Sequence, residues 1–171
     1  MKISVDDLYR AAIRLHQQGR TAEAGKLYEG ILGQRPRHAG ALHLKGVLAL
    51  QAGQYDEAVA LIERSLKIEP QHALALSNLG VAYRALRRHE EAITVLRKAV
   101  AIDPGLTDAL ANLGETLVRA GEVAESVIYN RRALERDPNR LGLQSSLLFA
   151  LNYLAENDPI EAAGQARRLG Q

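Results

Sequence analysis

Few side chains in the sequence could carry out metal or nucleophilic chemistry, and their spacing suits neither. The chain has no cysteine, which excludes disulfides, thiolate catalysis and cysteine-ligated zinc. The positions of His38 and His72 differ by 34, a spacing that reflects the architecture of the chain. No two histidines lie three or four residues apart on one helix with a supporting carboxylate, and no set of serine, histidine and aspartate can be recognised. The other histidines are His16, His43 and His89. We therefore expect no metal, no cofactor and no catalytic residue.

One stretch superficially matches a phosphate-binding loop. Residues 19–26 read GRTAEAGK, but five residues separate the glycines where four are needed, and Leu27 follows where serine or threonine would bind magnesium. The stretch also lies between two predicted helices, with no strand before it. Glu90 and Glu91 open a predicted helix, where negative charge is favourable, and this explains them better than paired-carboxylate catalysis. We interpret the protein as a non-enzyme.

Basic residues gather in two clusters that could bind phosphate. The net charge is only +2, from 22 basic and 20 acidic residues, which argues against a dedicated nucleic-acid binder. The nearly balanced charge favours the interpretation that both clusters lie on a solvated outer face. The alternative is an RNA-binding array, whose affinity would fall steeply as salt rises. The clusters are Arg84, Arg87, Arg88, His89, Arg97 and Lys98, and then Arg131, Arg132, Arg136 and Arg140.

The elements that must position these residues recur along the chain with a fixed period of 34. The period is visible in a proline column, a glycine column and an alanine column: Pro36, Pro70, Pro104 and Pro138; Gly46, Gly80 and Gly114; Ala24, Ala58 and Ala92. A fixed period of this length, with two amphipathic helices in each unit, is typical of a solenoid. The proline ends each second helix because it disfavours the α conformation in the residue before it. The small residues let helices approach closely, and we expect large residues such as Tyr28 and Leu96 to fill the gaps opposite.

The period predicts the helices and their turns. Ser4 and Asp7 have the spacing of a capping box, and Thr21 can cap the second helix. Glycine stands at the turns within the first, second and fourth repeats. Arg87 stands at the turn within the third, where we expect another turn geometry or a left-handed residue. Helices are predicted over about 5–18, 21–34, 39–52, 55–68, 73–86, 89–102, 107–120 and 123–136, then over 141–155 and 159–169.

With these columns in place, the chain resembles the tetratricopeptide repeat family. The third repeat matches best, through Leu79-Gly80, Tyr83, Ala92, Ala99 and Pro104, whereas the second has Lys45 where leucine is usual. The resemblance implies an all-α fold, a right-handed superhelical solenoid of antiparallel helix pairs that forms one domain over 1–171. Its units are the repeats 5–38, 39–72, 73–106 and 107–140, and a degenerate fifth over 141–169 that caps the last apolar surface.

The same resemblance implies that the first helices line a concave groove, which binds a peptide or helix of a partner protein. The wall is partly apolar and partly cationic, which suits an extended segment with an apolar anchor and acidic flanks. The apolar groove face of the second repeat leaves self-association as the alternative. The candidate groove residues are Arg10, Ile13, His43, Leu44, Val47, Ser77, Asn78, Val81, Arg84, Asn112, Glu115 and Arg119.

Two of these candidates, Asn78 and Asn112, stand one repeat apart and directly precede Leu-Gly. A side-chain amide offers both a donor and an acceptor, so it can pair with a peptide backbone whatever the peptide's sequence. Arg10, Leu44 and Ser146 stand in the same column, which would confine backbone capture to the C-terminal half of the groove. The alternative is that both asparagines merely face water. Neither is expected in the core.

A second resemblance concerns the C-terminal segment. Residues 147–168, LLFALNYLAENDPIEAAGQARR, are similar to the stretch that leads into the catalytic part of bacterial relatives of O-linked N-acetylglucosamine transferase. This implies an alternative function, the substrate-presenting repeats of such a glycosyltransferase, whose catalytic domain is absent here. An ordinary apolar capping helix followed by a turn explains the same residues equally well.

The composition gives an expected compartment. The first residues contain no apolar core of signal-peptide length, and no apolar run approaches the length of a membrane span. We therefore expect a cytoplasmic protein with no membrane association and a protein or peptide as its partner.

Overall fold

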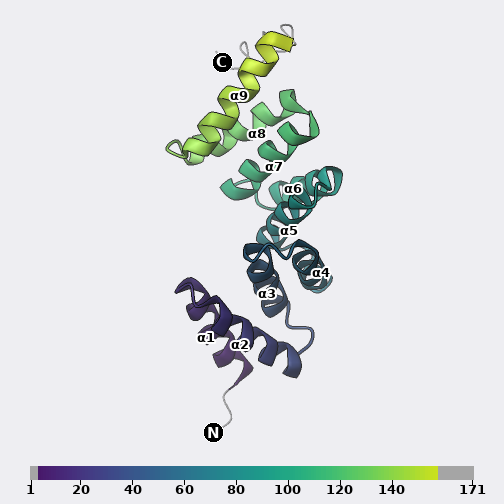
Figure 1. Ribbon diagram of the computed structural model, residues 1–171, viewed down its shortest axis with the longest axis vertical. Helices are drawn as coiled ribbons and strands as arrows, with labels where there is room; N and C mark the ends of the chain where they lie inside the picture. Colours follow the sequence, from purple (N-terminus) through teal and green to yellow (C-terminus); the bar gives the residue numbers. More distant parts are fainter. Residues whose placement is uncertain (1–3, 158–171) are drawn as a thin grey trace.

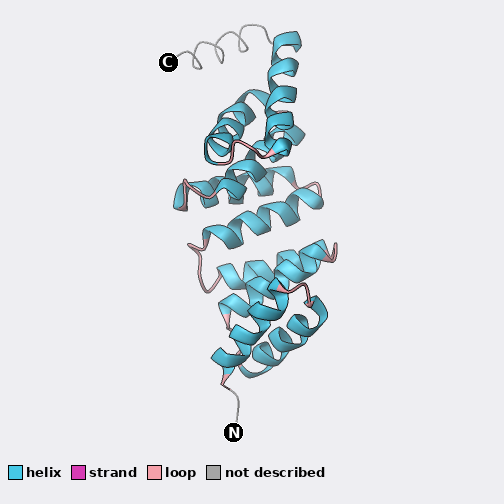
Figure 2. Ribbon diagram, turned by 90° about the vertical axis from the view of Figure 1, so that its left-hand side faces the viewer, coloured by secondary structure: helices cyan, strands magenta, loops and turns pink. Residues whose placement is uncertain are grey.

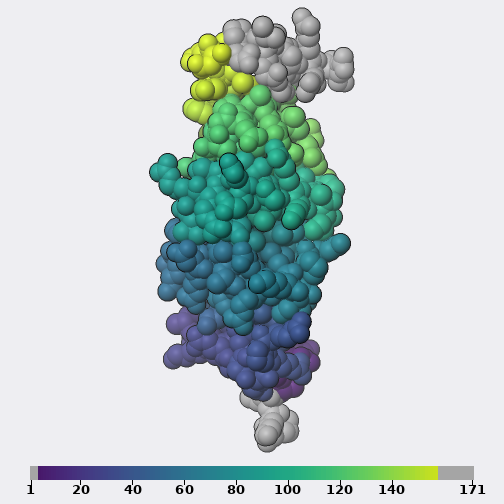
Figure 3. All heavy atoms as spheres, turned by 90° about the vertical axis from the view of Figure 1, so that its right-hand side faces the viewer, coloured from purple at the N-terminus to yellow at the C-terminus, as the bar shows by residue number. Residues whose placement is uncertain are grey.

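The computed structural model describes residues 4–157, which form α-helices joined by short turns (Figure 1). The helices pair antiparallel, and the pairs stack from one end of an elongated molecule to the other (Figure 2). In the space-filling view the repeats occupy successive bands along this axis (Figure 3). The predicted all-α solenoid is confirmed. Its helices are α1 (Val5–Gln17), α2 (Thr21–Gln34), α3 (Ala39–Gln51), α4 (Tyr55–Leu66), α5 (Ala73–Ala85), α6 (His89–Ile102), α7 (Thr107–Ala120), α8 (Val123–Arg136) and α9 (Leu141–Asn157).

The helix ends follow the sequence closely, with a few differences. Ser4 accepts a hydrogen bond from the Asp7 amide at 3.1 Å and donates one to its carboxylate at 2.6 Å, so Ser4 caps α1 as predicted, whereas the reciprocal bond of a full capping box, from the Ser4 amide to Asp7, does not form among the described residues. Thr21 is not a cap but the first residue of α2, because Arg20 stands in the capping position, without a side-chain bond to the helix end. Helix α4 ends two residues before the predicted end, and α9 extends two residues beyond it. The predicted helix over 159–169 lies outside the described residues.

The turns within repeats need a left-handed residue. Glycine provides it in three of them, with φ of 74° at Gly19, 75° at Gly53 and 88° at Gly121. Arg87 has a φ of 61°, so the third repeat makes the same turn with a residue that adopts this conformation less readily. Arg87 therefore keeps the tight turn that aligns α5 with α6.

Close helix crossings explain the glycine column. A Cβ atom added at Gly80 would lie 2.8 Å from Cδ2 of Leu96, and one added at Gly46 would lie 2.6 Å from Cγ1 of Ile62. Both opposing side chains are fully buried. Helices α3 and α5 thus each receive a large side chain from the second helix of their own repeat, as the sequence predicted.

The fourth repeat departs from this packing rule. Asn130 occupies the position of Leu96, and its Cγ would lie 2.8 Å from a Cβ added at Gly114. The side chain is fully buried, and neither its amide nitrogen nor its oxygen has a hydrogen-bond partner among the described residues. An unpaired buried amide costs about 1–3 kcal/mol, so this crossing is less stable than the one before it.

The junction between the first two repeats lacks the apolar pair that joins the later repeats. Val59 and Leu79 belong to one continuous core, but the corresponding residues one repeat earlier are Gly25 and Lys45. Lys45 instead forms an ion pair with Glu29 at 3.1 Å, beside a cavity of about 370 Å³. The core of α1 and α2 is a separate cluster, to which α3 contributes Ala41.

Candidate peptide-binding groove

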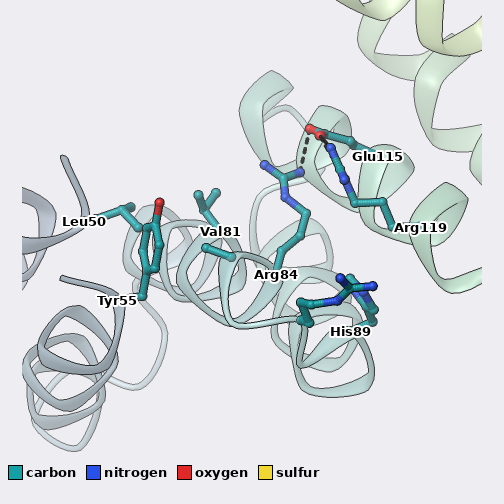
Figure 4. Close-up of a pocket in the computed structure, with 9 residues that line it drawn as sticks. Leu50, Tyr55, Val81, Arg84, His89, Glu115 and Arg119 are labelled. Atoms are coloured by element: carbon teal, nitrogen blue, oxygen red, sulfur yellow. Dashed lines mark hydrogen bonds and ion pairs between the residues drawn. The ribbon is translucent and has the colours of Figure 1, made fainter. Parts of the chain in front are cut away.

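One hollow of the described residues lies where the first helices α3, α5 and α7 end and the second helices α4 and α6 begin. Its volume is about 600 Å³. Four residues predicted for the groove, Val81, Arg84, Glu115 and Arg119, meet in its wall. In Figure 4, Val81 lies between the apolar pair Leu50 and Tyr55 and the charged residues Arg84, Glu115 and Arg119. The full lining is Leu50, Tyr55, Val81, Arg84, Ala85, Arg87, His89, Glu115 and Arg119; we call this hollow the central groove.

The charged side of the central groove is built around one carboxylate. Glu115 accepts hydrogen bonds from Arg84 at 2.7 Å and from Arg119 at 3.0 Å. The Arg84 side chain is only 16% exposed, and this burial lowers its pKa, although the charge of Glu115 acts in the opposite direction. Arg87 also lines the hollow and forms no ion pair with any described residue. The lining thus contains three arginines and one glutamate, which leaves an excess of positive charge.

Sequence reasoning missed the second-helix contribution to this hollow. Tyr55 and His89 begin α4 and α6 in corresponding positions of consecutive repeats. A prediction restricted to first helices could not include them. The available signal was the turn itself, because the short connection through Gly53 or Arg87 brings the start of each second helix beside the end of the first.

The two groove asparagines are engaged with neighbouring repeats. The Asn78 amide nitrogen lies 3.0 Å from Nε2 of His43, and the Asn112 amide donates to the Ser77 hydroxyl at 3.2 Å. Both asparagines are half-buried. They link α3 to α5 and α5 to α7, so the expectation of side chains that merely face water needs correction. Neither amide oxygen has a partner among the described residues, and both could accept a hydrogen bond from a ligand.

Other predicted groove residues have different positions. His43 and Ser77 are buried, at 3% and 1% exposure, so they support the asparagines from behind and are not open to a ligand. Burial, with a smaller contribution from the neighbouring His72, lowers the pKa of His43 to about 4. Leu44 packs against the core of the first repeat. Arg10 is exposed and forms an ion pair with Asp7, and Arg10, Ile13 and Val47 do not line the central groove.

Sequence models of the tetratricopeptide repeat match residues 9–72, 43–107 and 83–148, which together span most of the chain. The chain belongs to the tetratricopeptide repeat (TPR) family. No curated protein matches the sequence.

Several solved TPR structures resemble this one. MamA 41-end from Desulfovibrio magneticus RS-1 is 27% identical, with a TM-score of 0.71 over 80% of this chain and 77% of that one. YrrB, described as a TPR protein with an unusual peptide-binding site, is 19% identical, with a TM-score of 0.77 over 93% and 81%. The first TPR of Spaghetti (RPAP3), solved bound to the HSP90 peptide SRMEEVD, is 26% identical, with a TM-score of 0.67 over 68% and 93%.

None of these matches supports the resemblance of the C-terminal segment to a glycosyltransferase. The matching sequence models are those of the tetratricopeptide repeat, and YrrB and the first TPR of Spaghetti are described as TPR structures. Part of that segment also lies outside the described residues. Within 4–157, no helix is long and apolar enough to cross a membrane.

Four of the ten residues in the basic clusters of this TPR chain, Arg84, Arg88, Arg97 and Arg140, form ion pairs with carboxylates. Arg97 binds Glu125 at 2.8 Å, and Arg140 binds Asp108 at 2.7 Å. Arg88 binds Glu91 at 2.8 Å and stacks over the Tyr83 ring, 4.4 Å from its centroid. This pairing fits the predicted solvated outer face. Lys98, Arg131 and Arg136 form no ion pair with a described residue, and two buried guanidinium nitrogens of Arg131 have no hydrogen-bond partner among the described residues.

Proposed function

We propose that this TPR domain is a protein-interaction scaffold that binds an extended, acidic segment of a partner in the central groove. A carboxylate of the partner pairs with Arg84 and Arg119, and an apolar side chain beside it packs on Tyr55 and Val81. The observation that carries this proposal is the partly buried Arg84, which shares Glu115 with Arg119 in a hollow with excess positive charge.

The physical chemistry of the groove supports a carboxylate ligand. A guanidinium group binds carboxylates through a planar fork of donors, and such charge-assisted hydrogen bonds are stronger than neutral ones. Arg84 is largely withdrawn from water, so pairing with it is screened less than pairing at the surface. Asn78 and Asn112 do not line the central groove, but their amide oxygens offer acceptors to a peptide backbone that extends beyond it along α5 and α7.

The relatives support the same class of ligand. YrrB is described as having a peptide-binding site. The first TPR of Spaghetti was solved with the peptide SRMEEVD, in which two glutamates lie between methionine and valine and an aspartate follows the valine. The pairing of Arg88, Arg97 and Arg140 with carboxylates favours a protein partner over RNA.

A random nonapeptide library displayed on phage tests the proposal. The wild-type domain should enrich peptides with Asp or Glu next to an apolar residue. The double variant Arg84→Gln, Arg119→Gln should bind the enriched peptides about ten-fold or more weakly, because charge-assisted hydrogen bonds are lost. The matched control is Arg88→Gln, Arg97→Gln, which removes the same charge outside the central groove and should leave affinity nearly unchanged.

Two results would contradict the proposal. One is enrichment of peptides without acidic residues, and the other is equal loss of affinity in the groove variant and its control. Strong, salt-sensitive binding of the wild-type domain to RNA, with no peptide enriched, would favour the RNA-binding array instead.

A further inference from the structure

A second hollow adjoins the central groove and reaches the C-terminal helix. Its volume is about 390 Å³, and it shares Glu115 and Arg119 with the central groove. Its opposite side is formed by Ser145, Ser146 and Phe149 of α9. The ion-paired Glu115 and Arg119 therefore stand between two hollows, one on each side.

The repeat register gives α9 the same groove face as the first helices before it. Phe149 stands in the column of Val81 and Glu115, one repeat after Glu115, and Ser146 continues the column of Asn78 and Asn112 in the same way. Helix α9 packs on α8 through Leu154 and Ala150, in a cluster that also contains Val127. These buried contacts fix α9 as the first helix of a fifth repeat, with Phe149 at a groove position.

Phe149 is available to a ligand. It is 54% exposed and stacks on Tyr153 with ring centroids 6.2 Å apart, so an aromatic surface already stands at the edge of the second hollow. A large exposed aromatic ring gains free energy when an apolar side chain covers it. Positive charge thus lies between two apolar surfaces, Tyr55 with Val81 on one side and Phe149 on the other.

We infer that α9 is a working part of the binding site, with Phe149 as a second apolar subsite, and that the partner segment carries an acidic residue between two apolar ones. This inference rests on the proposed function, because it adds a binding surface, Phe149, for the partner residue that stands next to the acidic one in the same groove. The acidic side chain binds Arg84 and Arg119. One apolar neighbour packs on Tyr55 and Val81, and the other packs on Phe149. The charge complementarity at the centre and the apolar surfaces at both ends select this occupant over a uniformly acidic one.

The phage-displayed nonapeptide library also tests this inference, with Phe149→Ser as the variant. The matched control is Leu148→Ser, since Leu148 is 60% exposed on the same helix and lines neither hollow. Wild type and control should enrich acidic residues with apolar residues on both sides. Phe149→Ser should keep the acidic residue and one apolar preference, lose the other, and bind the wild-type peptides about five- to twenty-fold more weakly. Neither exposed residue belongs to the core, so both variants should fold.

The outcomes separate this inference from the proposed function. Equal enrichment by Phe149→Ser and wild type would overturn the role of α9 while leaving the acidic site intact. If the wild-type domain itself does not enrich acidic residues, both the proposed function and the role of α9 are overturned. Light scattering adds a second criterion: if the wild-type domain is a dimer that Phe149→Ser converts to a monomer, the aromatic surface serves self-association and the subsite is refuted.

Discussion

Replacement of Gly80 tests the repeat register and the close packing of α5 on α6. In a helix, Gly→Ala gains about 1 kcal/mol from the better propensity of alanine. At Gly80 the new Cβ would lie 2.8 and 2.9 Å from the two δ-carbons of the fully buried Leu96, so the crossing must open. Overpacking of this kind costs about 1–3 kcal/mol. We therefore expect Gly80→Ala to range from neutral to about 2 kcal/mol destabilising, and Gly80→Val to be clearly worse.

Gly30 provides the matched control for this change. It also lies inside a helix, but a Cβ added there meets nothing within 4 Å. Gly30→Ala should therefore gain about 1 kcal/mol. The exposed change Lys98→Ala should have little effect. Melting followed by circular dichroism at 222 nm measures all of these variants, and 1 kcal/mol corresponds to about 2–4 °C in a domain of this size.

The refuting result is a gain at both glycines. If Gly80→Ala raises the melting temperature as much as Gly30→Ala does, Leu96 does not fill the gap opposite Gly80, and the helix crossing is not where the structure places it. Because solenoids can unfold repeat by repeat, the comparison uses urea titrations as well, in which a local change in the third repeat remains visible.

Three further predictions concern single contacts. Asn130→Leu should stabilise the domain by about 1–3 kcal/mol in urea titrations, because it removes an unpaired buried amide; an unchanged midpoint would mean that the amide is satisfied. The stability of the wild type should fall as the pH drops from about 6.5 to about 4, because the pKa of His43 is lowered to about 4 on folding and only the unfolded chain takes up the proton in this range. His43→Ala should flatten that slope in thermal melts, and an unaltered slope would contradict the burial argument. Asn78→Ala with Asn112→Ala should cost about 1–3 kcal/mol in all and weaken the binding of library peptides, whereas unchanged melting and affinity would remove both side chains from the groove.

The sequence predicts the fold of this chain well because one packing rule is repeated. A small residue, a large residue opposite it and a proline stop recur in each repeat, so errors in one repeat are corrected by its neighbours. The left-handed turn at Arg87 could also be foreseen, because three other turns place glycine there. The capping role assigned to Thr21 was wrong because no repeated column supports it, and helix ends shift by one or two residues easily.

The groove was predictable only in part, because a position in a repeat does not determine exposure. Val81, Arg84, Glu115 and Arg119 lie together in one hollow, since they come from the neighbouring first helices α5 and α7, and their role in binding stays a prediction. His43 and Ser77 share a column that also looks accessible in sequence, yet each is buried by the asparagine of the next repeat. That burial depends on contacts across repeats, which the pattern within one repeat does not contain.

The junction between the first two repeats, which lacks the apolar pair of the later ones, lies outside the central groove. In a solenoid, stability is approximately the sum of repeat energies and nearest-neighbour interface energies. Gly25 and Lys45 replace an apolar pair at the first interface, whereas Val59 with Leu79 and Ile93 with Leu113 continue one core through the next two interfaces. Helix α2 carries three glycines, each costing about 1 kcal/mol of helix propensity. We therefore expect the first repeat to open more easily than the second and third, while the central groove lies entirely in the second, third and fourth repeats.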